Sequence, residues 1–197
     1  MRLEPLVLLP LAAFVALASL FVIVIRRAGR LIAQTRELQA FRARVRDLDS
    51  RIGQSLEGAS ERIDAVRRQQ LAATGIGDTL VAASDAVARY ADEARALRGP
   101  VEAPMIGQDI AHELERAGRA IDMVEHGVTI LASVRRGGRE LEAQTSIKRG
   151  YLNLVHAREA ISRHAARAAA LQPRDAPNRA WQGLLPEVRD DPSDHTI

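Results

Sequence analysis

The chain has 197 residues, with 28 basic and 25 acidic side chains, a formal net charge of +3 and no cysteine. Without cysteine it has no disulfide, no thiolate metal ligand and no thiol nucleophile. Aromatic residues make up only 3% of the chain, and no basic patch with interleaved aromatics is present, so we expect no nucleic-acid binding. Ala and Arg, both good helix formers, dominate the composition, and the sequence predicts an all-α fold.

A long apolar segment follows a short N-terminal tail of residues 1–4. Residues 5–25 (PLVLLPLAAFVALASLFVIVI) contain no charged side chain, and Arg26, Arg27 and Arg30 come directly after them. A helix needs about 20 apolar residues to cross a hydrocarbon core of roughly 30 Å. The segment therefore predicts a transmembrane helix over residues 5–25, flanked by these three arginines, with membrane lipid as a partner.

A cleaved secretory signal is the alternative interpretation of this segment. Ala16 and Ala18 satisfy the small-residue rule of a cleavage site. However, the apolar core of a signal is about 7–15 residues long, which is shorter than this run. Only Arg2 supplies a basic region before it. The length and the flanks therefore favour an uncleaved anchor.

The arginines after the segment predict its orientation. Basic residues within about 15–20 positions of a span stay on the cytoplasmic side. Six arginines follow the apolar segment within this distance, whereas only Arg2 precedes it. They are Arg26, Arg27, Arg30, Arg36, Arg42 and Arg44. We expect a single-pass protein of the cell (inner) membrane whose C-terminal region is cytoplasmic.

A heptad repeat occupies residues 26–74. Its apolar positions are Leu31, Leu38, Val45 and Ile52 at seven-residue intervals, with Phe41 and Leu48 between them, and the stripe shifts phase at Leu56. This pattern is typical of a coiled coil. We expect its interaction residues, which are Leu38, Phe41, Val45, Leu48 and Ile52, to pair two copies as a parallel homodimer. The alternative is that the same stripe packs on the chain's own hairpin.

Residues 75–104 predict a hinge, a short helix and a loop. The sequence from Thr74 to Asp78 interrupts the heptads, and Asp78 is a suitable cap for a helix that continues to Arg98. Gly99 and Pro100 then end this helix. No proline lies between residues 26 and 74, so the anchor and the coiled coil are also compatible with one continuous helix.

Two amphipathic helices joined by a glycine turn fill residues 105–171. The first carries an apolar residue every three or four positions from Ile110 to Leu131, and the second does so from Ile147 to Ala165. Two such helices pack as an antiparallel hairpin. Together with the short helix after residue 78, they have enough apolar surface for a small bundle.

Five polar residues share the face opposite the apolar stripe of the first of these helices. They are His112, Glu115, Arg119, Asp122 and His126. Histidines and carboxylates can hold a divalent metal, but the Glu-x-x-His pair of di-iron bundles is missing and Arg119 interrupts the row. We interpret the row as a solvated polar face and expect no metal.

The segment IAHELER around His112, with Ile121 nine positions later, resembles the phosphoacceptor box of sensor histidine kinases. In that family a histidine on a dimerising helical hairpin is phosphorylated, and the proteins are anchored in the membrane. This chain has Glu-Arg-Ala from Glu115 onward where that family has an Arg-Thr-Pro run. The resemblance implies that His112 accepts a phosphoryl group from a separate kinase.

The C-terminal residues 172–197 are rich in Pro and Asp and predict a segment that is disordered in isolation. Trp181, the only tryptophan, lies three and four residues before Leu184 and Leu185, so one helical turn brings the three side chains together. We expect them to dock a protein partner, because such anchors fold into grooves on other proteins. The alternative is that Trp181 packs on the chain's own bundle.

The catalytic motifs that a sequence can reveal are missing. We find no Gly-x-Ser-x-Gly elbow, no His-Glu-x-x-His pair and no phosphate-binding P-loop. We therefore expect no enzymatic activity and no cofactor. The sequence predicts a membrane-anchored helical scaffold or tether that self-associates through its coiled coil and docks a protein partner. The alternative is a membrane-linked signalling module, with His112 as the phosphoacceptor or with the hairpin as a conformational relay.

Overall fold

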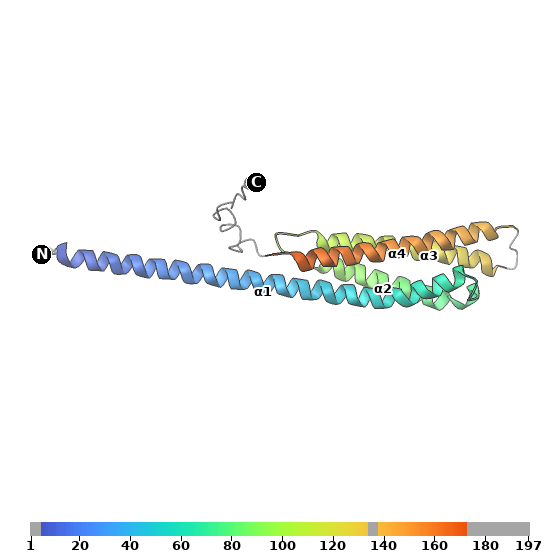
Figure 1. The fold of residues 1–197 in the computed structure, drawn as a ribbon, viewed down its shortest axis with the longest axis horizontal. Coiled ribbons are helices and arrows are strands. Elements are labelled where there is room, and N and C mark those ends of the chain that lie inside the picture. Colours follow the sequence, from blue (N-terminus) through green and yellow to red (C-terminus); the bar gives the residue numbers. More distant parts are fainter. Residues whose placement is uncertain (1–4, 134–137, 173–197) are drawn as a thin grey trace, which may run out of the picture. The chain divides into compact units, whose positions relative to one another are not determined.

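The computed structural model describes residues 5–133 and 138–172 (Figure 1). Within these ranges the chain is helical and contains no strand. Its elements are α1 (Pro5–Arg67), the short 3₁₀ helix η1 (Ala73–Gly75), α2 (Gly77–Ala96), α3 (Ile106–Ala132) and α4 (Glu140–Ala170). The predicted all-α class is confirmed.

The predicted anchor and heptad segments lie on one helix, because α1 runs without a break from Pro5 to Arg67. The helix α1 ends at Arg67, whereas the predicted heptad segment extends to residue 74. The chain divides into two units, one made of residues 1–32 and 172–197 and the other of residues 33–171. The second unit contains the remainder of α1 and all the later helices.

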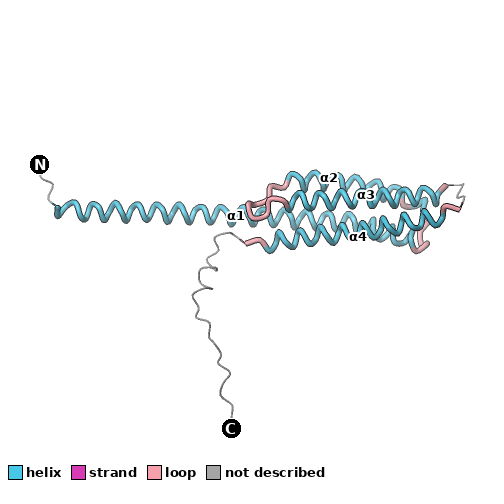
Figure 2. The backbone as a smooth tube through the Cα atoms, turned by 90° about the horizontal axis from the view of Figure 1, so that it is seen from above, coloured by secondary structure: helices cyan, strands magenta, loops and turns pink. Residues whose placement is uncertain are grey.

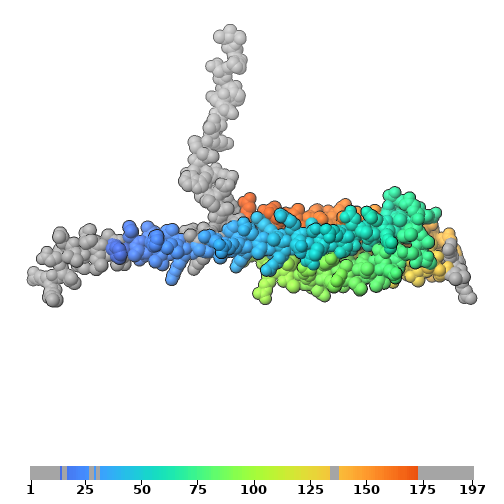
Figure 3. All heavy atoms as spheres, turned by 90° about the horizontal axis from the view of Figure 1, so that it is seen from below, coloured from blue at the N-terminus to red at the C-terminus, as the bar shows by residue number. Residues whose placement is uncertain are grey.

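The unit of residues 33–171 is a four-helix bundle in which successive helices run in opposite directions (Figure 2). The hydroxyls of Ser55 in α1 and Tyr90 in α2 lie 3.0 Å apart, and Ser162 in α4 donates to Asp49 in α1 at 3.1 Å. Figure 3 shows the second half of α1 between α2, in green, and α4, in orange. Because α3 packs against both α2 and α4, it closes the bundle on the far side of its core.

The heptad stripe of α1 is buried inside this bundle. The predicted interaction residues Leu38, Phe41, Val45, Leu48 and Ile52 are each at most 5% exposed. All but the first belong to one core that also contains apolar residues of α2, α3 and α4. The stripe therefore packs on the chain's own helices, as in the alternative considered above. Pairing two copies through it would require the bundle to open.

The predicted phase shift lies within this core. The buried positions of α1 step by four residues twice in succession, from Leu48 to Ile52 and from Ile52 to Leu56. Two consecutive steps of four break the alternation of three and four that a strict heptad requires. The stripe nevertheless stays buried beyond the shift, at Ile63 and Val66, because the other helices surround this face of α1.

Two glycines let the backbones of α3 and α4 approach closely. A Cβ atom at Gly127 would lie 2.7 Å from the carbonyl oxygen of Ala143, and one at Gly150 would lie 2.6 Å from that of Ala120. Real Cβ atoms do not come this close to another heavy atom. The predicted hairpin is thus held at a separation that only a hydrogen side chain allows at these two positions.

We expect Gly150→Ala to lower the free energy of unfolding by about 1–3 kcal/mol, because the added methyl group would press on the backbone of α3. Gly58→Ala is the matched control. No atom lies within 4 Å of a Cβ there, and alanine is the better helix former by about 1 kcal/mol. Denaturant unfolding of the full chain in detergent, followed by circular dichroism, measures both. Stabilisation by both substitutions would contradict the close approach.

Candidate functional site

The N-terminal part of α1 presents large apolar side chains to its surroundings. Those between positions 14 and 25 are all exposed where the structure describes them, and Phe14 and Leu17 are each 71% exposed. The set comprises Phe14, Leu17, Leu20, Phe21, Val22, Ile23, Val24 and Ile25. The last five are consecutive, and at 3.6 residues per turn they point in every direction around the helix. From Phe21 to Ile25, α1 therefore has no polar face.

The predicted anchor is only partly covered by the described residues. The side chains of residues 5–13, 15 and 16 lie outside them, as do those of Arg27 and Arg30, whereas Arg26 is exposed. Among the helices of the described part, none combines the length and the hydropathy that crossing a membrane requires.

The predicted docking residues of the tail also fall outside the description. Trp181, Leu184 and Leu185 lie in residues 173–197, whose structure is not described. The described chain ends just after α4, with Leu171 and Gln172. The docking of a partner by the tail therefore stays a prediction from the sequence.

The predicted polar row on α3 is exposed, and the carboxylates beside its histidines are engaged by arginines. Arg95 of α2 donates to Glu115 at 2.6 Å, which lowers the pKa of Glu115. His112 Nδ1 lies 4.0 Å from the same carboxylate group. His126 Nε2 lies 3.7 Å from Glu142 of α4, whose pKa is lowered by a hydrogen bond from the arginine three residues before it. The row therefore links α3 to both neighbouring helices.

These contacts do not assemble a metal site. Among the residues that the structure describes, no three histidine or acidic side chains lie close enough together to hold a metal ion. Arginine side chains occupy the carboxylate oxygens that a cation would need, at Glu115 and at Glu142. The polar row is better explained as a surface that pairs charges between helices.

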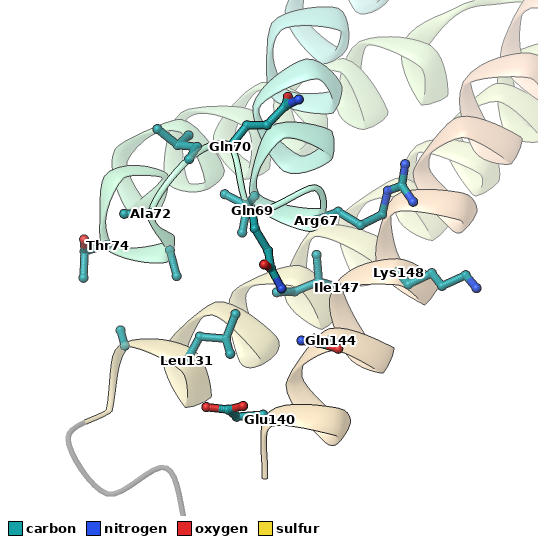
Figure 4. Close-up of a pocket in the computed structure, with 14 residues that line it drawn as sticks. Arg67, Gln69, Gln70, Ala72, Thr74, Leu131, Glu140, Gln144, Ile147 and Lys148 are labelled. Atoms are coloured by element: carbon teal, nitrogen blue, oxygen red, sulfur yellow. The ribbon is translucent and has the colours of Figure 1, made fainter. Parts of the chain in front are cut away.

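A pocket of about 840 Å³ opens at the end of the bundle where α1 leads into α2 (Figure 4). Its walls come from residues 66–74, from the end of α3 and from the start of α4. Ile147 is buried in the wall, and Gln69 and Gln144 supply polar groups. In Figure 4 the side chain of Gln69 extends from the loop toward Ile147, while that of Lys148 points away. Sequence reasoning missed this pocket because its three segments meet only in the folded bundle.

Gln69 has a strained backbone. Its φ of 63° is the only positive value at a non-glycine residue among those described. The N–H of Gln70 donates to the carbonyl of Ala65 at 2.8 Å, and that of Gln69 donates to Val66 at 3.0 Å. These two bonds form a Schellman motif, in which glycine usually occupies the left-handed position. An L-residue in that position costs about 1–2 kcal/mol.

The lining of the pocket combines amide and charged side chains with an apolar wall. Arg67 is held by Asp64 at 2.6 Å and lies 5.3 Å from the centre of the Tyr151 ring. Thr74, Glu140 and Lys148 also line the pocket. Its amide side chains can donate and accept hydrogen bonds beside an apolar wall.

Comparisons with protein families, with curated proteins and with solved structures find no match for this chain. No relative therefore supplies a substrate, a partner or a functional residue. The function has to be inferred from the exposed apolar segment of α1, from the charges of the bundle and from its pocket.

We expect Gln69→Gly to raise the free energy of unfolding by about 1 kcal/mol, because glycine adopts a positive φ without the steric cost of a Cβ atom. Gln70→Gly is the control, since the neighbouring residue has no positive φ. Glycine there adds only conformational freedom to the unfolded chain and should destabilise. Both values come from denaturant unfolding of the full chain. A loss of stability in the first variant would contradict the left-handed turn.

Proposed function

We propose that the chain is a single-pass, membrane-anchored helical scaffold or tether whose four-helix bundle is cytoplasmic. The observation that carries this proposal is the exposed apolar segment of α1 from Phe14 to Ile25. A helix that is apolar on every side has two stable environments, the core of a large protein or a membrane. The bundle of residues 33–171 has its own closed core, so we assign the membrane.

The size of the hydrophobic effect supports this choice. Burial of a Leu, Ile, Val or Phe side chain is worth about 1.5–3 kcal/mol, so eight exposed ones amount to more than about 10 kcal/mol. That is comparable with the whole stability of a typical domain. Lipid removes this cost on all sides of the helix at once, whereas a groove on one protein would cover a single face.

The orientation follows from the charges beside the segment. Arg26 is exposed directly after it, and the sequence places further arginines over the next turns. Basic residues that flank a membrane span stay on the cytoplasmic side of the membrane. The bundle and the tail with Trp181 would then face the cytoplasm, where the tail is available to a protein partner.

A cysteine introduced at Ser193 should resist a membrane-impermeant thiol reagent in intact cells and react once the cells are lysed. A cysteine at Leu3 is the matched control on the other side and should react in intact cells. The chain contains no cysteine of its own, so each label reports one position. Rapid labelling at Ser193 in intact cells would overturn the orientation.

The signalling module with His112 as phosphoacceptor remains the second candidate. One observation favours it, since 66% of the His112 side chain is exposed and an approaching kinase could reach it. The neighbouring Glu115 is held by an arginine of α2, which leaves the imidazole on the outer face of the bundle. A scaffold tolerates the replacement of His112, whereas a phosphoacceptor does not.

We expect His112→Gln to leave a scaffold functional, because the exposed imidazole contributes little to packing. His156→Gln is the control, since His156 is an exposed histidine on α4. Cells that depend on the protein should grow equally with either variant. Loss of function with His112→Gln alone, together with loss of an acid-labile phosphoryl group on the protein, would decide in favour of the phosphoacceptor.

A further inference from the structure

The charges of the bundle are unevenly distributed along its axis. We define the entry end as residues 33–46 of α1, the loop of residues 97–105 and residues 165–171 of α4. Residues Glu37, Phe41 and Arg44 of α1 line a small cavity with Arg98 and Pro100 of the loop, which shows that α1 and the loop lie together there. The entry end contains six arginines and two glutamates, for a net charge of +4. They are Arg36, Arg42, Arg44, Arg46, Arg98 and Arg167, with Glu37 and Glu102.

The adjoining part of the bundle has a negative net charge. Residues 47–59, 85–96, 106–122 and 150–164 carry eleven acidic and seven basic side chains, for a net charge of −4. Arginines there are neutralised across helices, as Arg51 is by Glu93 and Arg95 is by Glu115. The positive charge of the entry end is therefore not a property of the whole bundle surface.

The arginines of the entry end lack such partners. Arg36, Arg44, Arg46 and Arg98 are exposed, and none of them forms an ion pair with another described residue. The side chain of Arg42 is partly buried, and its Nε atom has no hydrogen-bond partner within the described part of the chain. Uncompensated arginines at one end favour an external anionic partner.

The loop of the entry end also exposes apolar side chains. A turn brings the N–H of Ala103 to the carbonyl of Pro100 at 3.0 Å. Val101 is 79% exposed and Met105 is 59% exposed. Arginines on the same end of a protein as a few exposed apolar side chains are a combination that suits an anionic membrane, where the charges meet headgroups and the apolar groups enter the interface.

We propose that the entry end of the bundle binds anionic lipid, so that the protein contacts the cytoplasmic leaflet a second time. This inference rests on the membrane anchor proposed above. Twelve residues separate Ile25 from Leu38 in the sequence, so the entry end is the part of the bundle that follows the proposed anchor most closely along the chain.

Lipid fits this surface better than nucleic acid does. Binding of single strands uses aromatic side chains on which bases stack, and the entry end has no exposed aromatic residue among those described. A lipid surface needs only positive charge and a few apolar groups. Each arginine near an anionic leaflet contributes about a fivefold preference for contact.

The test uses the full chain in vesicles. A cysteine is introduced at Val101 and labelled with an environment-sensitive fluorophore, and the absence of native cysteine makes the label unique. We compare vesicles of phosphatidylcholine alone with vesicles that also contain phosphatidylserine. The label should move to an apolar environment only with phosphatidylserine, and high salt should reverse the change. A label at Thr74, at the opposite end of the bundle, should respond to neither.

Charge variants complete the test. Arg44→Gln with Arg98→Gln should lower the ratio of membrane-contacting to free bundles about fivefold for each arginine removed. Lys148→Gln with Arg149→Gln removes the same charge from exposed positions near the start of α4, away from the entry end, and should leave the signal unchanged. Equal loss in both double variants, or a label at Val101 that ignores phosphatidylserine, would overturn this inference. Flotation of the chain with phosphatidylcholine vesicles tests the anchor separately. If the chain does not float with these neutral vesicles, the proposed anchor is wrong, and this result differs from a failure of the lipid contact at the entry end.

Discussion

The burial of one apolar stripe of α1 against three later helices is the interaction on which the rest of this structure depends. From Phe41 to Val66 the stripe joins a single core with side chains of α2, α3 and α4. Most of the stability of a helix in a protein comes from the packing of its apolar face and not from helix propensity. The second half of α1 is therefore an integral part of the bundle and not a separate stalk.

Burial of the stripe leaves few large apolar side chains on the surface of the bundle. Most large apolar side chains of the bundle are buried inside it, and Val101 and Met105 of the loop are among the exceptions. The large apolar side chains of α1 that the structure describes between positions 14 and 25 are not part of that core and are exposed. One helix therefore combines a part that is buried within the bundle with a part whose described apolar side chains are exposed.

Arginine has two distinct roles in this molecule. Around the middle of the bundle, Arg51 and Arg95 connect helices through carboxylates of their neighbours. Such exposed pairs add little to stability individually, but they keep that surface electrically balanced. At the entry end, Arg36, Arg44, Arg46 and Arg98 are exposed and form no ion pair with another residue that the structure describes. The same residue type is thus paired between helices in one region and exposed without an ion pair in another, within the described part of the chain.

The sequence by itself determined the local elements. Periodic apolar residues predicted the helices from Ile110 to Leu131 and from Ile147 to Ala165, and the glycine turn between them predicted their hairpin, because these signals lie within one segment. It could not decide what covers the stripe of Leu38 to Ile52. Helices in bundles and in homodimers use the same coiled-coil packing and therefore the same spacing. The tertiary structure shows that the chain's own helices cover the stripe, because α2, α3 and α4 also have apolar faces that pack against it. The pocket beside Gln69 and the unpaired charge of the entry end likewise arise from segments far apart in the chain, whose proximity no local pattern records.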